Sequence, residues 1–115
     1  MGGLEERYER GLTLKSEGRY EDALAEFNAI LEENPGHIDA RRQLGLVYGF
    51  MGLFDESLQE LLSAVQMDPS NVGTRNDLAL TYAMLGMADE AKAEFEAVLV
   101  ADPNNDVARR NMVYF

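Results

Sequence analysis

The part of the sequence that most resembles a chemical site is a run of oxygen-bearing side chains, Asp102-Pro103-Asn104-Asn105-Asp106. Carboxylate and amide oxygens at alternate positions open a calcium-binding loop in this way. Such a loop needs glycine at its sixth position for a sharp turn and glutamate at its twelfth for bidentate coordination. The chain has Val107 and Val113 there. The run therefore predicts a turn followed by a helix N-cap, and no metal site.

Side chains that could act as nucleophile or base are scattered. The single histidine, His37, has no cluster of acidic side chains near it in the sequence, and we expect it to cap a helix. The chain has no cysteine, which excludes a thiol nucleophile, a disulfide framework and a thiolate zinc site. No base recurs at a fixed spacing from the serines Ser16, Ser57, Ser63 and Ser70. The glycines are dispersed, so no phosphate-binding loop is present, and the pattern predicts no enzyme and no cofactor.

The charge balance limits the partners that the chain can have. Its 115 residues include 21 Asp and Glu against 10 Lys and Arg, a net charge of −11. Nucleic acids and anionic membrane surfaces attract basic surfaces, so neither is expected as a partner. No apolar run approaches the roughly 18 residues of a membrane span, and the first residues lack the features of a signal peptide. We therefore expect a cytoplasmic protein with a single domain, residues 1–115.

An internal repeat organises the whole chain. The three prolines, Pro35, Pro69 and Pro103, are equally spaced. The same shift along the chain aligns three glycines, four arginines and three acidic pairs: Gly18, Gly52, Gly86; Arg7, Arg41, Arg75, Arg109; Glu21-Asp22, Asp55-Glu56, Asp89-Glu90. A fixed period of this size, between about 20 and about 50 residues, indicates stacked supersecondary units.

Each unit is predicted to contain two helices joined at its glycine. Apolar residues recur at helical spacing on both sides of the glycine, which suits the left-handed C′ position at a helix end. His37, Asn71 and Asn105 stand where the first helices need N-caps, and the acidic pairs fall in the first turns of the second helices. The proline prevents the second helix from continuing. The predicted helices are 4–17, 20–33, 38–51, 54–67, 72–85, 88–101 and 106–114.

Small residues recur where the two helices of a unit should meet. Gly11, Gly45 and Ala79 hold this column on the first helices. The facing column on the second helices is also small, with Ala23, Ser57 and Ala91. Large residues in the neighbouring columns would fill the remaining space: Phe27, Tyr48, Tyr82 and Phe95. Alternating small and large residues predict closely packed helix pairs.

These columns resemble the tetratricopeptide repeat, whose signature is Trp-x2-Leu-Gly-x2-Tyr, then Ala-x3-Phe, then Pro, with a period of about 34 residues. The third unit supplies Leu78-Ala79, Tyr82, Ala91, Phe95 and Pro103. The main departure is the arginine column in place of tryptophan. The resemblance implies an all-α solenoid, a right-handed superhelix of three repeats (about 4–37, 38–71 and 72–105) with a partial fourth unit, a short closing helix, at 106–115.

The resemblance also implies that the first helices line a concave face that binds an extended peptide or a helix. The residues it places on this face are Tyr8, Leu12, Arg42, Leu46, Phe50, Asn76, Leu80, Met84 and Arg110. We expect Phe50 and Met84 to border an exposed apolar groove, whereas Leu46 and Leu80 could equally belong to the core. Arg42, Asn76 and Arg110 would form a polar row able to bind a peptide, or would be ordinary exposed residues.

Some proteins with this repeat carry a carboxylate clamp that binds the C-terminal carboxylate of a chaperone. The clamp requires asparagine and basic side chains in particular columns. Those columns hold Tyr8, Leu12, Gln43, Gly73 and Asp77 in this chain. The clamp is therefore expected to be absent.

The arginine column allows two interpretations. Its members could bind an acidic partner. Alternatively, each stem packs on the preceding second helix while its guanidinium pairs with a carboxylate, and we favour this structural interpretation because regular columns in a solenoid serve stacking.

The last helix is apolar on more than one side. Met112, Tyr114 and Phe115 are therefore candidate residues for self-association, and a homo-oligomer is possible, unless the chain is a module of a longer array. The predicted function is a protein–protein interaction module that binds a protein or peptide partner in its concave groove. The alternatives are a self-assembling structural protein that uses this C-terminal helix, or a domain of a larger regulator.

Overall fold

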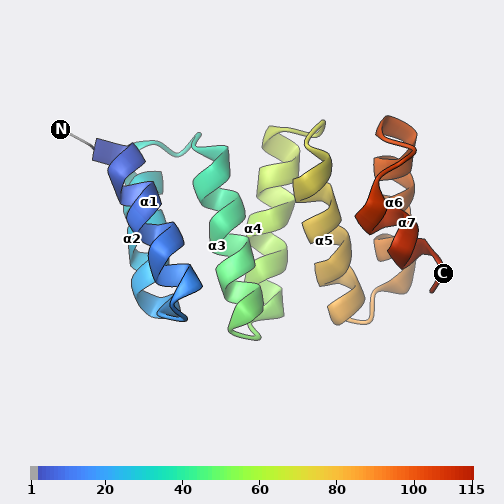
Figure 1. Cartoon of the computed structure of the whole chain (residues 1–115), viewed down its shortest axis with the longest axis horizontal. Helices are drawn as coiled ribbons and strands as arrows, with labels where there is room; N and C mark the ends of the chain where they lie inside the picture. The colour runs from blue at the N-terminus through green and yellow to red at the C-terminus, as the bar shows by residue number, and fades with distance from the viewer. Residues whose placement is uncertain (1–2) are drawn as a thin grey trace.

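The computed structural model describes residues 3–115, which form seven α-helices and no strand (Figure 1). Every boundary lies within about two residues of its predicted position. The molecule is elongated, 45 × 26 × 20 Å, with the helices in chain order along its long axis. The helices are α1 (Gly3–Ser16), α2 (Tyr20–Glu33), α3 (Ile38–Phe50), α4 (Phe54–Met67), α5 (Val72–Met84), α6 (Ala88–Ala101) and α7 (Asp106–Met112).

The turn inside each repeat is made by the glycine column. At the end of α3, the Leu53 N–H donates to the Tyr48 carbonyl at 2.9 Å, and the Gly52 N–H donates to the Gly49 carbonyl at 3.0 Å. This pair of bonds is the Schellman motif, which requires a left-handed residue at C′. Gly52 has φ +78°, and Gly18 and Gly86 each have φ +76°. The prediction that the glycines end the first helices is confirmed.

The first helices begin with side-chain caps. His37 Nδ1 accepts the Ala40 N–H at 3.0 Å, and Asn71 Oδ1 accepts the Thr74 N–H at the same distance. Asn105 caps α7 in the same way. All three predicted caps are therefore confirmed. The second helices have no side-chain cap, and their acidic pairs lie in the first turn, where carboxylates interact favourably with the helix dipole.

Removing one cap should have a modest effect on stability. We expect Asn71→Ala to lower the free energy of unfolding by about 1 kcal/mol, because the Thr74 N–H loses its acceptor. Denaturant titration followed by circular dichroism measures this change. Asn71→Ser retains a capping oxygen and should restore most of the loss. If Asn71→Ser costs as much as Asn71→Ala, the cap is not the source of the stability.

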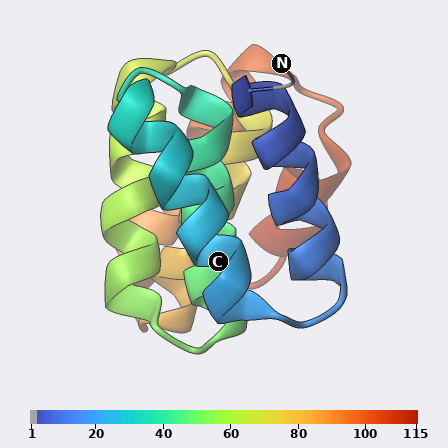
Figure 2. The ribbon, with the colours of Figure 1, turned by 90° about the vertical axis from the view of Figure 1, so that its left-hand side faces the viewer.

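The helices form two layers. In Figure 1 the odd-numbered helices lie toward the viewer and the even-numbered helices lie behind them. Figure 2 shows the same layers from the end, with α1 on the right and α4 on the left. Each helix packs on its neighbours in the chain, as expected of a solenoid. We call the surface formed by α1, α3, α5 and α7 the first-helix face.

The predicted close approach of paired helices is present in every repeat. Gly45 is buried, and a Cβ atom at that position would lie 2.6 Å from the Cγ of Leu61. A Cβ on Gly11 would lie equally close to the ring of Phe27. Ser57 adds a buried hydrogen bond, in which its Oγ donates to the Gly45 carbonyl at 2.7 Å. Small residues at these crossings thus let the large side chains of the second helix fill the space above them.

The arginine column is structural in the three complete repeats. Arg75 Nη1 lies 2.7 Å from Glu94, and its Nη2 donates to the Pro69 carbonyl at 2.9 Å. The same ion pair joins Arg7 to Glu26 and Arg41 to Glu60, at the same separation along the chain. The predicted pairing with a carboxylate is confirmed. The carboxylate partner lies on the second helix of the arginine's own repeat, which follows it in the chain, and the predicted packing of the stem on the preceding second helix stays a prediction.

The C-terminal residues divide between packed and exposed positions. Met112 is half-buried against the core of Ala79, Phe95 and Val98. The Phe115 ring lies 6.1 Å from the Phe95 ring between centroids, and Phe115 remains 39% exposed. Tyr114, which follows Val113, is exposed. Of the three predicted self-association residues, two therefore contact the chain's own last repeat.

Candidate functional site

An apolar groove opens between the second and third repeats. It has a volume of about 280 Å³ and lies between α3, the start of α4 and α5. We call it the inter-repeat groove. It is lined by Gly45, Leu46, Gly49, Phe50, Phe54, Ser57, Asp77, Leu80, Thr81 and Met84.

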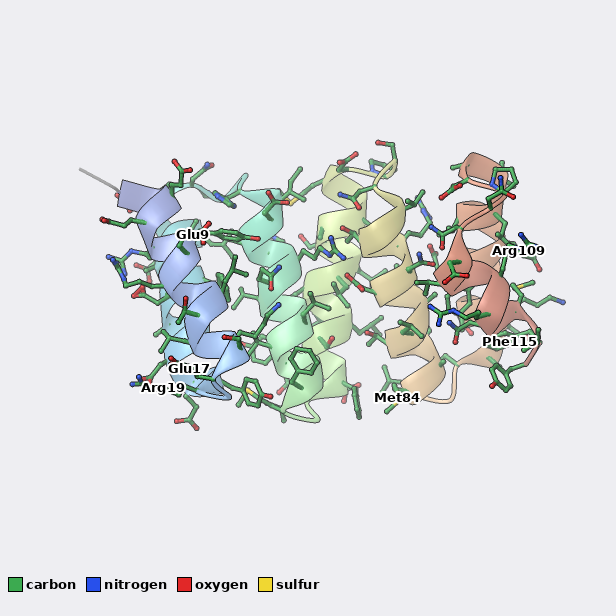
Figure 3. All side chains as sticks on the ribbon, in the orientation of Figure 1. Glu9, Glu17, Arg19, Met84, Arg109 and Phe115 are labelled. Carbon is green, nitrogen blue, oxygen red and sulfur yellow. The ribbon has the colours of Figure 1, made fainter. Side chains whose placement is uncertain are left out.

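The structure brings together the four apolar residues predicted for this region. Phe50 is 60% exposed and Met84 is 64% exposed, on opposite sides of the groove. Leu80 is 38% exposed, and Leu46 is half-buried. Of the two interpretations that the sequence left open for the leucines, Leu80 fits the exposed groove, whereas Leu46 lies between core and surface. Figure 3 shows Met84 at the end of α5.

The groove is open because its wall is built from small residues. Gly49 has no side chain, and the Ser57 hydroxyl is directed to the Gly45 carbonyl rather than into the space between the repeats. At the preceding junction, Tyr20 stacks on Phe50 with 5.9 Å between ring centroids. An aromatic ring therefore covers one side of Phe50, while its other side borders the groove.

Sequence reasoning missed several lining residues, of which Phe54 is the largest. Phe54 is the first residue of α4, and it occupies the place in the second repeat that Tyr20, the first residue of α2, occupies in the first. An aromatic residue at matching positions of two repeats is a signal that could have identified it. Gly49 carried no such signal, because its contribution is the absence of a side chain.

One charged residue, Asp77, lines the mainly apolar groove. Asp77 Oδ2 accepts a hydrogen bond from Arg42 Nε at 2.6 Å, which joins α5 to α3. Burial raises the pKa of the Asp77 carboxyl, and the Arg42 guanidinium opposes this rise only in part. Nearby, Lys15 Nζ donates to Gln43 Oε1 at 2.7 Å, and burial lowers the pKa of Lys15. The central polar groups of the first-helix face are thus engaged in bonds between repeats.

The predicted polar row does not form as expected. Asn76 is only 5% exposed, and its Nδ2 donates to Asn105 Oδ1 at 3.0 Å, so it links α5 to the cap of α7 and is not available to a ligand. Arg42 is paired with Asp77. Arg110 is exposed and lies 3.3 Å from Asp106 on its own helix. Helical phase placed these three in one column, but the middle one, Asn76, is buried and bonded to the N-cap of α7.

Tyr8 and Leu12 lie apart from the inter-repeat groove. The Tyr8 ring packs edge-on against Phe27 at 5.7 Å and near His37 at the same separation, and burial raises its pKa. Leu12 is half-buried against the core of the first two repeats. Both residues therefore stabilise the N-terminal repeats and are outside the groove's lining.

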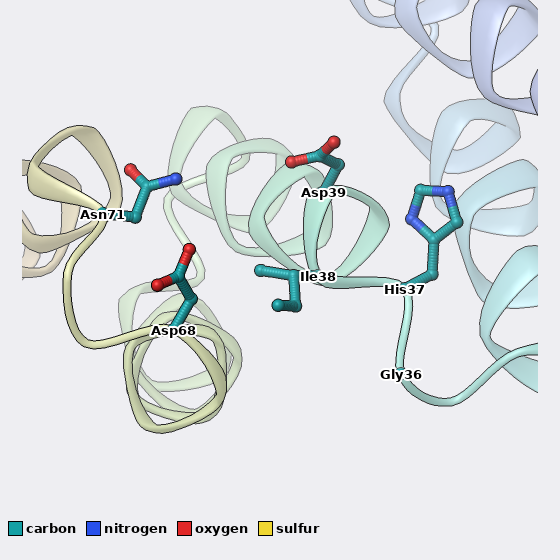
Figure 4. A pocket seen from close by; sticks show the side chains of 6 residues that line it. All are labelled: Gly36, His37, Ile38, Asp39, Asp68 and Asn71. Atoms are coloured by element: carbon teal, nitrogen blue, oxygen red, sulfur yellow. The ribbon is translucent and has the colours of Figure 1, made fainter.

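A second cavity, of about 320 Å³, lies at the opposite ends of the first helices (Figure 4). Figure 4 shows Asp68 and Asn71 on one side, His37 on the other, and Ile38 and Asp39 between them. Its polar groups already serve the chain, since His37 and Asn71 cap helices and Asp68 accepts a hydrogen bond from Ser70. Within residues 3–115, no group of three or more His, Cys, Asp or Glu side chains could hold a metal ion.

The family model of the tetratricopeptide repeat matches residues 14–65 and 51–111. Together these segments cover most of the chain, and the helix pairs described above have the period and packing of that repeat. The chain therefore belongs to the tetratricopeptide repeat family. Comparison with curated proteins gives no significant match. No helix in the described part of the chain combines the length and apolar character needed to cross a bilayer.

Solved structures share the fold at low sequence identity. The first TPR of Spaghetti (RPAP3), bound to the HSP90 peptide SRMEEVD, is 20% identical, with a TM-score of 0.91 over 96% of this chain and 88% of that one. The TPR domain of Arabidopsis OM64 is 19% identical, with a TM-score of 0.91 over 99% and 94%. The second TPR domain of human RPAP3, in complex with the HSP70 peptide SGPTIEEVD, is 22% identical, with a TM-score of 0.88 over 97% of each chain.

Proposed function

We propose that this chain is a protein–protein interaction module that binds a segment of a partner protein in the inter-repeat groove. The observation that carries the proposal is the exposure of Phe50 and Met84 across an apolar cavity on the first-helix face. Large side chains that remain exposed beside a preformed cavity supply contact area for a ligand without a cost in rearrangement. Structures with the same fold were solved with peptides bound, which supports a peptide as the ligand.

The polar residues argue against an acidic chain terminus as the ligand. The peptides in the two RPAP3 complexes end in Glu-Glu-Val-Asp. In this chain Asp77 lies beside the groove, where the family's clamp would need a basic side chain, and Arg42 and Lys15 are engaged in bonds within the protein. The terminal carboxylate of such a peptide would lie near the Asp77 carboxylate, and neither Arg42 nor Lys15 would be free to offset the repulsion between the two. We therefore propose an internal, apolar-anchored segment as the ligand.

The groove can be tested without knowing the natural partner. Peptides from a random dodecapeptide display library would be selected on the chain, and their affinities measured by fluorescence anisotropy. We expect Phe50→Ala to weaken the selected peptides by about tenfold or more, because an exposed anchor of this kind contributes to binding. The same substitution should change the melting temperature by no more than a few degrees, because Phe50 is largely outside the core.

Val100→Ala provides the matched control, because Val100 is an exposed apolar residue of α6 on the opposite layer. It should leave the affinities unchanged. If the selected peptides bind Phe50→Ala and Val100→Ala equally well, the ligand site lies elsewhere. A Phe50→Ala protein that melts as early as Phe95→Ala would instead place Phe50 in the core.

A further inference from the structure

The charges around the inter-repeat groove are predominantly negative. Asp55 and Glu56 directly follow the lining residue Phe54, and both are exposed in the first turn of α4. Within residues 3–115 neither forms an ion pair. The corresponding acidic pairs of the neighbouring repeats, Glu21-Asp22 and Asp89-Glu90, are on the same edge of the solenoid because the second helices all begin there. The edge beside the groove is therefore mainly acidic, and its α2 end also carries Arg19, which pairs with Asp22 at 2.9 Å.

The groove's own polar group has the same sign. Asp77 lines the groove, and Arg42 Nε is the one side-chain donor to its carboxylate in the described residues. An ionised carboxylate can accept several hydrogen bonds, so Asp77 can still accept one from a ligand. Burial also raises the pKa of the Asp77 carboxyl, and the Arg42 guanidinium opposes this rise only in part. A cation that reached Asp77 from the groove would stabilise the charged form.

From these observations we propose that the inter-repeat groove selects partner segments in which apolar anchors are flanked by lysine or arginine. This inference rests on the proposed function and specifies its ligand. The anchors would lie between Phe50 and Met84. A basic side chain would extend its apolar stem along the groove toward Asp77, and a second would lie over Asp55 and Glu56 at the edge. An acidic segment would place like charges together at both points, which opposes binding.

The selection described above tests this ligand class directly. Peptides selected on the chain should carry a higher net positive charge than the starting library. Individual peptides would then be compared with versions in which each Lys or Arg is replaced by Glu, and we expect the basic versions to bind about tenfold more tightly. The difference should shrink in about 0.5 M NaCl, because salt screens charges at an exposed edge.

A protein of net charge −11 attracts basic peptides nonspecifically, so the test needs a matched pair of double variants. Asp55→Asn with Glu56→Gln removes two charges beside the groove. Glu32→Gln with Glu33→Gln removes two charges from the last turn of α2, at the other edge of the solenoid. We expect the first double variant to weaken the basic peptides about threefold or more, and the second to have a smaller effect than that.

The outcomes separate this inference from the proposed function. If the two double variants weaken binding equally, or if the Glu versions bind as tightly as the basic versions, the inferred selectivity is wrong. In that case a loss of binding on Phe50→Ala would still support the groove as the ligand site. If no selected peptide loses affinity on Phe50→Ala, the groove itself is not the site and both proposals fail.

Discussion

Replacing Phe95 with alanine should lower the free energy of unfolding by about 3–5 kcal/mol, because the phenyl ring is fully buried and its removal leaves a cavity. Phe95 packs among Ala79, Val98 and Ala108, and the Phe115 ring covers it. Three helices, α5, α6 and α7, therefore lose contact area together. Small domains shift by several degrees per kcal/mol, so the melting temperature should fall by at least about 10 °C.

The comparison of Phe95→Ala with Phe50→Ala separates fold from function. Both substitutions remove a phenylalanine ring, but Phe50 is mostly exposed whereas Phe95 has no exposed surface. Calorimetry should show a large loss of stability only for Phe95→Ala. Two similar losses would mean that Phe50 is a core residue, and two small losses would mean that the last repeat is not packed as described.

Leucine at Gly45 should be the second severe change. A Cβ atom alone would lie 2.6 Å from Leu61 Cγ and 2.8 Å from Leu61 Cδ2, well inside ordinary contact distance. The rest of a leucine side chain would force α3 and α4 apart and disturb the hydrogen bond from Ser57 to the Gly45 carbonyl. Overpacking of this kind costs about 1–3 kcal/mol or more, measurable by denaturant titration.

Gly49, one helical turn further along α3, provides the control. A Cβ atom there would lie 3.5 Å from Ser57 Oγ, which is an ordinary contact. Gly49→Ala should therefore be tolerated, and it should stabilise the protein by up to about 1 kcal/mol because alanine favours the helix. If Gly49→Ala destabilises the protein as much as Gly45→Leu, the helices do not leave more space for a side chain at position 49 than at position 45.

The local features of the fold could be predicted from the sequence because the interactions that form them join residues only a few positions apart. An N-cap reaches only three residues along the chain, as from Asn71 to Thr74, and a Schellman turn spans six, as from Tyr48 to Leu53. The internal repeat presents these signals three times. The helix boundaries, the caps, the left-handed glycines and the small residues at the helix crossings were therefore all predicted correctly.

The arginine column has a role that its period predicts and a geometry that the period alone does not determine. Its period identified a structural role and a carboxylate partner, and both are present. Which second helix the guanidinium reaches, the preceding one or the following one, depends on how far the side chain extends and on where the two layers of helices meet. Arg75 reaches Glu94 on the following helix, and its Nη2 also donates to the Pro69 carbonyl in the loop before α5.

By itself the sequence determined the all-α repeat, its element boundaries and the apolar column on the first-helix face, since these follow from spacing along the chain. Only the tertiary structure decided which of those residues are available to a ligand. Asn76 and Phe50 both belong to predicted face columns, yet Asn76 is buried against the N-cap of α7 and Phe50 is open beside Gly49. Exposure depends on the size of side chains contributed by neighbouring repeats, and therefore on contacts between residues of different repeats that no single helix specifies.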